Sequence, residues 1–191
     1  MSWLLLGLVL FLGAHSSRVF AEGWRQAQIN RWGERVWKGA YSLLSLLGLV
    51  LIVWGYGQAR QTPLALWVPV AAFRHLAGVM MLIAFVLVAA AYVPRNAFKA
   101  RVGHPMVLGV KVWALAHLLA NHTLADAWLF GAFLVWSVLC FTASRRRDRR
   151  LGIEAPTATR AGTALTLVVG LGAWLVFVLW AHVALIGVRP Y

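Results

Sequence analysis

The residues best suited to chemistry lie in one apolar segment, residues 104–122, with the sequence HPMVLGVKVWALAHLLANH. This segment is apolar enough to enter a membrane, yet it carries three histidines, a lysine and an asparagine. Ionisable groups at membrane depth are costly and usually face the interior of a helix bundle, so they mark candidate functional sites. In a helix, Trp113, His117 and Asn121 recur every four residues and share one face. We therefore predict that this face lines a site and that the rest of the chain positions it.

The composition is that of an integral membrane protein. Of 191 residues, 62% are hydrophobic and 12% are charged, whereas soluble domains average about 25% charged residues. The formal net charge is +13, which in a soluble protein would indicate nucleic-acid binding. Here the basic residues lie in loops beside apolar segments, which favours an anionic membrane surface and argues against nucleic acid as a partner. The single cysteine, Cys140, excludes an internal disulfide.

Six apolar segments each approach the ~20 residues that are needed to cross ~30 Å of hydrocarbon. They span approximately residues 2–20, 39–57, 64–93, 104–121, 124–143 and 161–187. The first could be a secretory signal cleaved before Glu22, but it has no basic residue at its start, so we interpret it as a span. We predict an all-α, polytopic membrane helix bundle of about six transmembrane helices, forming a single domain over residues 1–191.

The loop charges predict the orientation of the bundle. Three alternate loops carry five, three and six basic residues, whereas the other loops and ends carry only Arg60 and Arg189. The positive-inside rule therefore places these three loops in the cytoplasm and both termini outside, in the periplasm if the membrane is a bacterial inner membrane. In the first of these loops, Trp24, Trp32 and Val36 share a four-residue spacing. That spacing predicts an interfacial helix on the cytoplasmic leaflet, with a solvated loop as the alternative.

The titratable residues limit the chemistry inside the membrane. All five acidic residues fall in loops or near an interface, which argues against a carboxylate proton relay and against acid–base hydrolysis within the bundle. Six histidines remain, and imidazole in an apolar bundle suits haem iron. His15 and His117 lie at similar depth if Lys111 reaches the cytoplasmic interface. If the fourth segment instead begins at His104, His117 lies ~20 Å deep and the pairing requires tilt.

Arg74 and His75 lie about ten residues into the third segment, near mid-membrane in this interpretation. An arginine at that depth requires an anion, and no mid-membrane carboxylate is available. A haem propionate or a lipid head group would supply the anion. The alternative is a tilted span that brings Arg74 to water or to backbone carbonyls.

Four motifs resemble a known family in their order and spacing. These motifs are GAHSSR, GERVWKGAYSLLSL, FRHLAGVMMLIAFVLVAAAYVP and HPMVLGVKVWALAHLLANH. By this pattern the chain resembles the NnrU family over nearly its whole length. NnrU proteins are polytopic membrane proteins associated with nitrite and nitric-oxide reduction in denitrifying bacteria. The resemblance implies a role of this kind.

The same pattern is similar to plant 15-cis-zeta-carotene isomerase, a haem b enzyme. The similarity implies that His15 and His117 are the two axial ligands of a haem. The isomerase has a cysteine three residues before its second ligand, where this chain has Ala114. A Cys/His ligand exchange is therefore not available here. A weaker likeness to membrane methyltransferases with an Arg-His-Pro motif lacks the arginine, because Gly103 precedes His104.

These observations together predict a membrane-embedded haem b with His15 and His117 as iron ligands. The other residues predicted to contact the cofactor are Arg74, Lys111, Trp113 and Asn121. Two histidine ligands suit electron transfer with a redox partner, or binding of a small gas such as nitric oxide when one histidine leaves. The alternatives are a haem-dependent isomerase of a carotenoid-like polyene, an S-adenosylmethionine-dependent methyltransferase, and a membrane protein without a cofactor.

Overall fold

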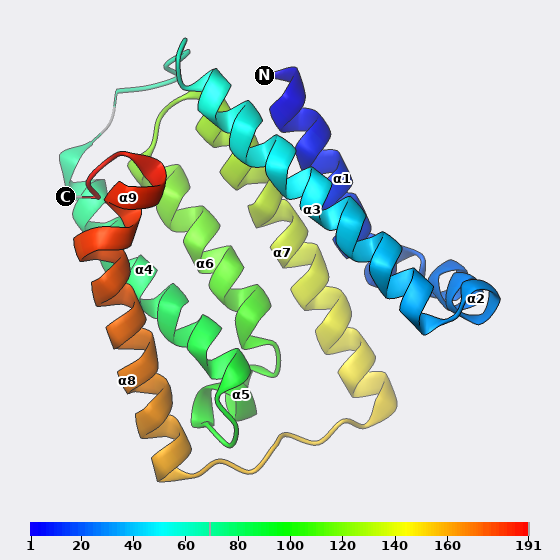
Figure 1. Ribbon diagram of the computed structural model, residues 1–191. Coiled ribbons are helices and arrows are strands. Elements are labelled where there is room, and N and C mark those ends of the chain that lie inside the picture. Colours follow the sequence, from blue (N-terminus) through cyan, green and yellow to red (C-terminus); the bar gives the residue numbers. More distant parts are fainter. Residues whose placement is uncertain (69, 191) are drawn as a thin grey trace.

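The chain folds into a bundle of long helices (Figure 1). The structure is a computed structural model, and it describes residues 1–68 and 70–190. In chain order the helices are α1 (Ser2–Phe20), α2 (Glu22–Trp32), α3 (Glu34–Ala59), α4 (Ala71–Tyr92), α5 (Ala97–Val102), α6 (Pro105–Ala120), α7 (Leu124–Leu151), α8 (Arg160–Val176), the π-helical turn η1 (Phe177–Ala181) and α9 (His182–Ile186).

Five helical segments are long and apolar enough to cross a membrane. They are α1, α3, α4, α7 and the continuous run of α8, η1 and α9 from Arg160 to Ile186. The remaining predicted span, the fourth in chain order, is α6, an apolar helix of 16 residues. Its length of about 24 Å falls short of the ~30 Å hydrocarbon layer. The predicted membrane bundle is thus confirmed for five spans, with a shorter sixth helix.

The third predicted span begins later than its hydropathy indicated. The prediction started at residue 64, whereas α4 starts at Ala71. The preceding segment makes backbone hydrogen bonds to the α6–α7 loop instead: Leu66 N donates to His122 O at 2.8 Å, and Leu124 N donates to Leu64 O at 2.9 Å. Arg74 therefore lies in the first turn of α4, and the prediction of a mid-membrane arginine is wrong.

The basic loops are also more helical than the hydropathy indicated. α2 confirms a helix after the first span, and α5 is a further short helix that was not predicted. α7 continues through the basic run SRRRDRR and stops at Gly152, which adopts a left-handed conformation (φ 62°). Hydropathy ended the fifth span at residue 143 because it cannot distinguish a solvated extension of a helix from a loop.

The helices pack side by side in an order that differs from the chain order. α3 packs on α1, α1 on α7, α7 on α6, α6 on α4, and α4 on α8 (Figure 1). α7 therefore occupies the middle of the row and separates α1 from α6. Since the two candidate haem ligands lie on α1 and α6, α7 is the helix that both of them can face.

The two ends of the bundle differ in character. At one end Trp3 of α1 contacts Trp54 of α3 with ring centroids 5.3 Å apart. Arg60, after α3, donates to the carbonyl oxygen of Ile186 in α9 at 3.2 Å, so both termini lie at this end. The opposite end carries the basic helices α2 and α5 and the arginine-rich end of α7. This separation of charge agrees with the pattern of alternate basic loops in the sequence.

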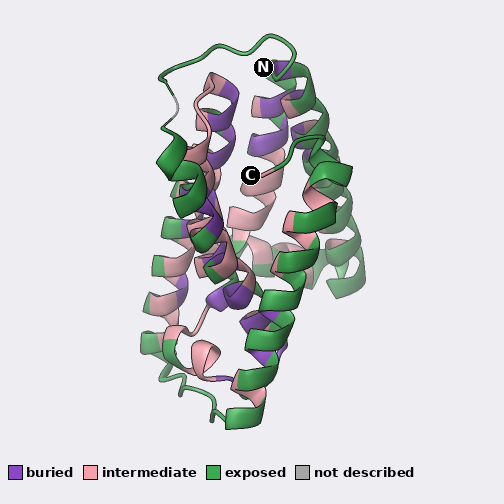
Figure 2. Ribbon diagram, turned by 90° about the vertical axis from the view of Figure 1, so that its left-hand side faces the viewer, coloured by how far each residue is buried: buried purple, intermediate pink, exposed green. Residues whose placement is uncertain are grey.

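One cluster of buried apolar residues lies between α1, α3 and α7, and further buried apolar residues lie along α4. The outward faces of the long helices are exposed (Figure 2), and many of their exposed side chains are apolar. The closest approach is between α1 and α3. A Cβ atom on Gly7 would lie 2.6 Å from the backbone nitrogen of Ile52, and one on Gly48 would lie 2.7 Å from that of Phe11. Small residues at helix interfaces let backbones approach closely in membranes, where packing and not burial from water drives association.

Candidate functional site

His15 lies near the basic end of α1 among aromatic rings. Its Nδ1 is 2.7 Å from the carbonyl oxygen of Phe11, one helical turn earlier. Its ring stacks on that of Phe11 with centroids 4.2 Å apart, and the rings of Tyr41 and Trp136 follow at 5.3 and 6.3 Å. Aromatic rings from three helices, α1, α3 and α7, therefore surround the imidazole.

His117 lies in the last turn of α6 in a more enclosed setting. Its Nδ1 is 3.0 Å from the carbonyl oxygen of Trp113, and its ring lies 4.6 Å from Phe130 and 5.4 Å from Trp113, measured between centroids. Asn121 Nδ2 donates to the carbonyl oxygen of His117 at 2.9 Å. Trp113, His117 and Asn121 thus lie together as predicted. The Asn121 side chain therefore bonds a backbone carbonyl at the C-terminal end of α6.

The two histidines share one hydrogen-bonding arrangement. A carbonyl oxygen only accepts, so Nδ1 carries the proton in both rings and Nε2 keeps its lone pair. Within the described part of the chain, no residue hydrogen-bonds Nε2 of either ring. Histidines that bind metals characteristically donate their other ring nitrogen to a carbonyl or carboxylate, which fixes the tautomer and the ring direction. Both side chains therefore fit the donor requirement of a haem iron.

A chain of aromatic contacts joins the two imidazoles. The ring of Phe133 on α7 lies 5.9 Å from Phe11 and 5.3 Å from Trp113. The neighbour of His15 on α7 is Trp136. His117 instead adjoins a ring six residues earlier on the same helix, at a level about 9 Å away by helical rise. α6 starts at Pro105, which is close to the helix start at His104 in the second of the two alternatives for His117.

One buried polar atom near His15 has no partner. Nε1 of Trp136 is buried and makes no hydrogen bond within the described residues. Leaving a buried N–H unpaired costs about 1–3 kcal/mol, so an orphaned donor in a native protein needs an explanation, of which a bound acceptor is one. The Trp136 indole therefore fits a site that receives a polar group.

The two candidate cationic partners lie at different levels of the bundle. Lys111 is half-buried in the second turn of α6. Arg74 is exposed in the first turn of α4. On this antiparallel pair Gly109 faces Ala84, which lies ten residues, or about 15 Å, from Arg74. Lys111 is the cation on the same helix as His117. Ala114, at the position of the isomerase's cysteine, is fully buried.

His104 belongs to a separate pair. It occupies the position just before α6 without capping the helix, and its Nε2 lies 2.8 Å from Asp148 Oδ2 on α7. A Cβ on Gly103 would lie 2.8 Å from Nη1 of Arg145, so the backbone is close to the basic part of α7. These contacts tie α6 to the arginine-rich end of α7.

One carboxylate is buried, which the sequence did not predict. Asp126, in the first turn of α7, is 5% exposed. It accepts hydrogen bonds from Tyr56 Oη on α3 at 2.6 Å and from Thr123 N and Oγ1 at 2.9 and 2.6 Å. The sequence TLAD is a capping-box signal. The Tyr56 partner, 70 residues away, has no sequence signal.

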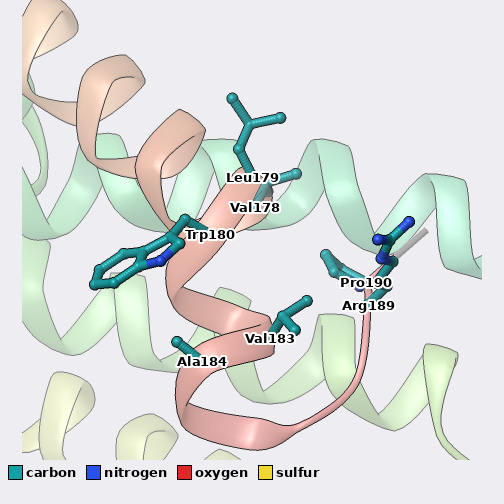
Figure 3. A pocket seen from close by; sticks show the side chains of 7 residues that line it. All are labelled: Val178, Leu179, Trp180, Val183, Ala184, Arg189 and Pro190. Carbon is teal, nitrogen blue, oxygen red and sulfur yellow. The ribbon is translucent and has the colours of Figure 1, made fainter.

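Two cavities lie at different ends of the described structure. One of about 630 Å³ lies at the C-terminal end (Figure 3). Its lining residues are Val178, Leu179, Trp180, Val183, Ala184, Arg189 and Pro190. The other, of about 280 Å³, opens beside His15 between α1, α2 and α3. Only the second borders a predicted site residue.

Comparison with known proteins identifies one family. The profile described as NnrU protein matches residues 3–190, nearly the whole chain. Neither the curated proteins nor the solved structures include a match to this sequence. The family name links its members to the regulation of nitric oxide reductase. A match over almost the full length, on a bundle of apolar helices, establishes that this membrane protein belongs to the NnrU family.

Proposed function

We propose that this protein binds one haem b, with His15 and His117 as the iron ligands, and serves nitrogen-oxide metabolism through electron transfer or binding of nitric oxide. The observation that carries the proposal is the shared state of the two imidazoles. Each donates Nδ1–H to its own helix and keeps Nε2 free, among aromatic rings. The link to nitrogen oxides rests on the family.

The side chains around the two histidines have separate roles in this proposal. The rings of Phe11, Phe130 and Phe133 exclude water from an apolar macrocycle. The orphaned indole N–H of Trp136 donates to an acceptor on the bound group. Lys111, six residues before His117 on α6, supplies a cation for a haem carboxylate. When bound, the haem supplies a redox-active iron whose ligands set its affinity for small gases.

The test is an absorption spectrum of the full-length protein purified in detergent, oxidised and dithionite-reduced, before and after haem addition. The wild type should show a Soret band and sharp reduced α and β bands. His15→Ala and His117→Ala should each broaden or abolish them. His104→Ala is the control, because Nε2 of His104 already bonds Asp148 Oδ2 on α7 and is not free to bind iron.

The outcomes separate the two ligands. Loss of the sharp bands in one variant only would leave a single-histidine haem site, in keeping with the different levels of the two rings along α7. A wild-type protein that stays colourless after haem addition would refute haem binding. In the reduced wild type, added nitric oxide should shift the Soret band if one histidine can leave the iron.

A further inference from the structure

A second site lies beside the aromatic chain, in the cavity of about 280 Å³ between α1, α2 and α3. The cavity is lined by residues from all three helices. They are His15, Ser17, Arg18, Arg25, Ile29, Glu34, Trp37, Lys38 and Tyr41. Drug-sized ligands occupy pockets of about 300–1,000 Å³, so this one suits a smaller group. Its lining carries three cationic side chains and one carboxylate.

The cations around the cavity form few and weak ion pairs with the protein. Arg25 Nη1 lies 3.1 Å from Glu22, and Lys38 Nζ lies 2.8 Å from Glu34. The Lys38–Glu34 pair is 71% and 68% exposed, and such surface pairs contribute little to stability. Arg18 forms no hydrogen bond or ion pair within the described residues. The cavity therefore offers three cations to an incoming anion at little cost in protein contacts.

The rigid part of the lining is aromatic. Trp37 on α3 lies edge-on to Trp24 of α2, with centroids 5.6 Å apart, and 6.5 Å from Trp32. Trp24 is 55% exposed, and Phe20 at the end of α1 is 69% exposed. Exposed aromatic residues beside cations are typical of the interface between membrane and water, where tryptophan rings sit at the level of the lipid head groups.

We propose that this cavity binds a phosphate group, as carried by the head group of an anionic phospholipid. Arg18, Arg25 and Lys38 hold the phosphate, and the exposed Trp24 and Phe20 contact the adjoining acyl chains. Basic pockets between transmembrane helices are a known means of holding anionic head groups. His15 also lines the cavity, but the phosphate is held by the three cations, so the proposal does not require a bound haem.

The experiment offers the detergent-purified full-length protein equal amounts of phosphatidylglycerol and phosphatidylcholine, and counts bound lipids by native mass spectrometry. The wild type should retain phosphatidylglycerol preferentially. Each cation near a membrane surface contributes about a five-fold change in affinity, so Arg18→Ala/Arg25→Ala should weaken retention about 25-fold. Arg31→Ala/Arg35→Ala is the matched control: it removes the same charge from the same region, but neither residue lines the cavity.

A parallel arm without lipid measures broadening of the phosphorus NMR line of inorganic phosphate. Broadening that Arg18→Ala/Arg25→Ala abolishes, without a preference for phosphatidylglycerol, would identify free phosphate as the source of the anion. Equal loss of phosphatidylglycerol in both double variants, or no anion preference in the wild type, would overturn the site.

Two further variants keep the test decisive. If Arg18→Ala/Arg25→Ala does not fold, Lys38→Gln should still weaken retention about five-fold. His117→Ala removes a proposed iron ligand that does not line the cavity, so it should retain phosphatidylglycerol as the wild type does. Loss of the lipid in His117→Ala would show that the anion site depends on the haem and would overturn its independence.

Discussion

The surroundings of His15 and His117 differ although their local bonding is the same. Each ring donates Nδ1–H to the carbonyl four residues earlier and rests on an aromatic side chain. His15, however, lines a basic cavity and adjoins the orphaned N–H of Trp136. His117 lies against Phe130, which is 4% exposed and part of the core. The hydrogen bond within the helix therefore orients each imidazole, whereas the packing of the neighbouring helices determines which groups surround it.

This contrast assigns different tasks to the two ends of the aromatic chain. The His117 end is packed, so substitutions of the aromatic residues around His117 should act mainly on stability. The His15 end has free polar atoms and a cavity, so substitutions there should act mainly on ligand binding. The comparison fails if the two ends respond alike to matched changes.

The largest effect is expected from Phe130→Ala on α7. Truncating a buried phenylalanine typically costs about 3–5 kcal/mol, from lost contacts and the cavity left behind. Phe11→Ala, which removes the half-buried ring on which His15 stacks, should cost less than half as much. The free energy of unfolding in detergent, measured by denaturant titration, checks both values. Equal losses would show that the His15 end is packed as tightly as the His117 end.

Asp126→Ala should have the next largest effect, about 2–3 kcal/mol of unfolding free energy. The substitution removes the acceptor of Tyr56 Oη and the capping partner of Thr123. Hydrogen bonds to charged groups contribute about 1.5–3 kcal/mol each, and the Tyr56 hydroxyl is left without its acceptor. Tyr56→Phe removes only one of these bonds and serves as the smaller matched change. A loss in Tyr56→Phe equal to that in Asp126→Ala would show that the cap contributes nothing.

Gly48→Ala should cost about 1–3 kcal/mol, because the added Cβ meets the backbone of Phe11, which cannot move without displacing α1. That displacement should reach His15, whose Nδ1–H bonds the Phe11 carbonyl, and leave His117 in place. Gly57→Ala on the same helix meets no atom within 4 Å and should be neutral or mildly stabilising. The thermal midpoint and the reduced haem spectrum of the two variants test this. If the thermal midpoint of Gly48→Ala falls while its haem spectrum is unchanged, the position of His15 does not depend on the α1–α3 contact.

The sequence predicted those features that depend on local pattern. Hydropathy located the spans, because about 20 apolar residues in succession have few other uses. Four-residue spacing brought Trp113, His117 and Asn121 together, because the helical period is fixed. The start of α4 at Ala71 was missed, because the apolar residues before it bond to the α6–α7 loop, and hydropathy does not report hydrogen bonds.

Other features of the site depend on which helices are neighbours, and the sequence does not state that order. α7 lies between α1 and α6, so His15 and His117 meet the same helix at different levels. A depth calculation on two separate spans cannot detect this offset. The Tyr56–Asp126 bond and the orphaned N–H of Trp136 likewise require α7 beside α1 and α3.

The smallest effect on stability, and the sharpest test of the comparison, is expected from Trp136→Phe. The substitution removes the unpaired N–H beside His15, so the ligand-free protein should lose little stability. If that N–H donates to the bound haem, the affinity for haem should fall about tenfold, the scale of one net hydrogen bond. Haem titration followed at the Soret band measures the change.

Trp174→Phe is the control for this last variant, because Trp174 on α8 also buries an unpaired indole N–H and loses the same volume on substitution. α8 packs on α4, at the far end of the row from α1, so Trp174→Phe should leave haem affinity unchanged. Comparing the two variants removes the contribution of ring size and isolates the N–H beside His15. Equal losses of affinity would mean that the position of the orphaned donor is irrelevant.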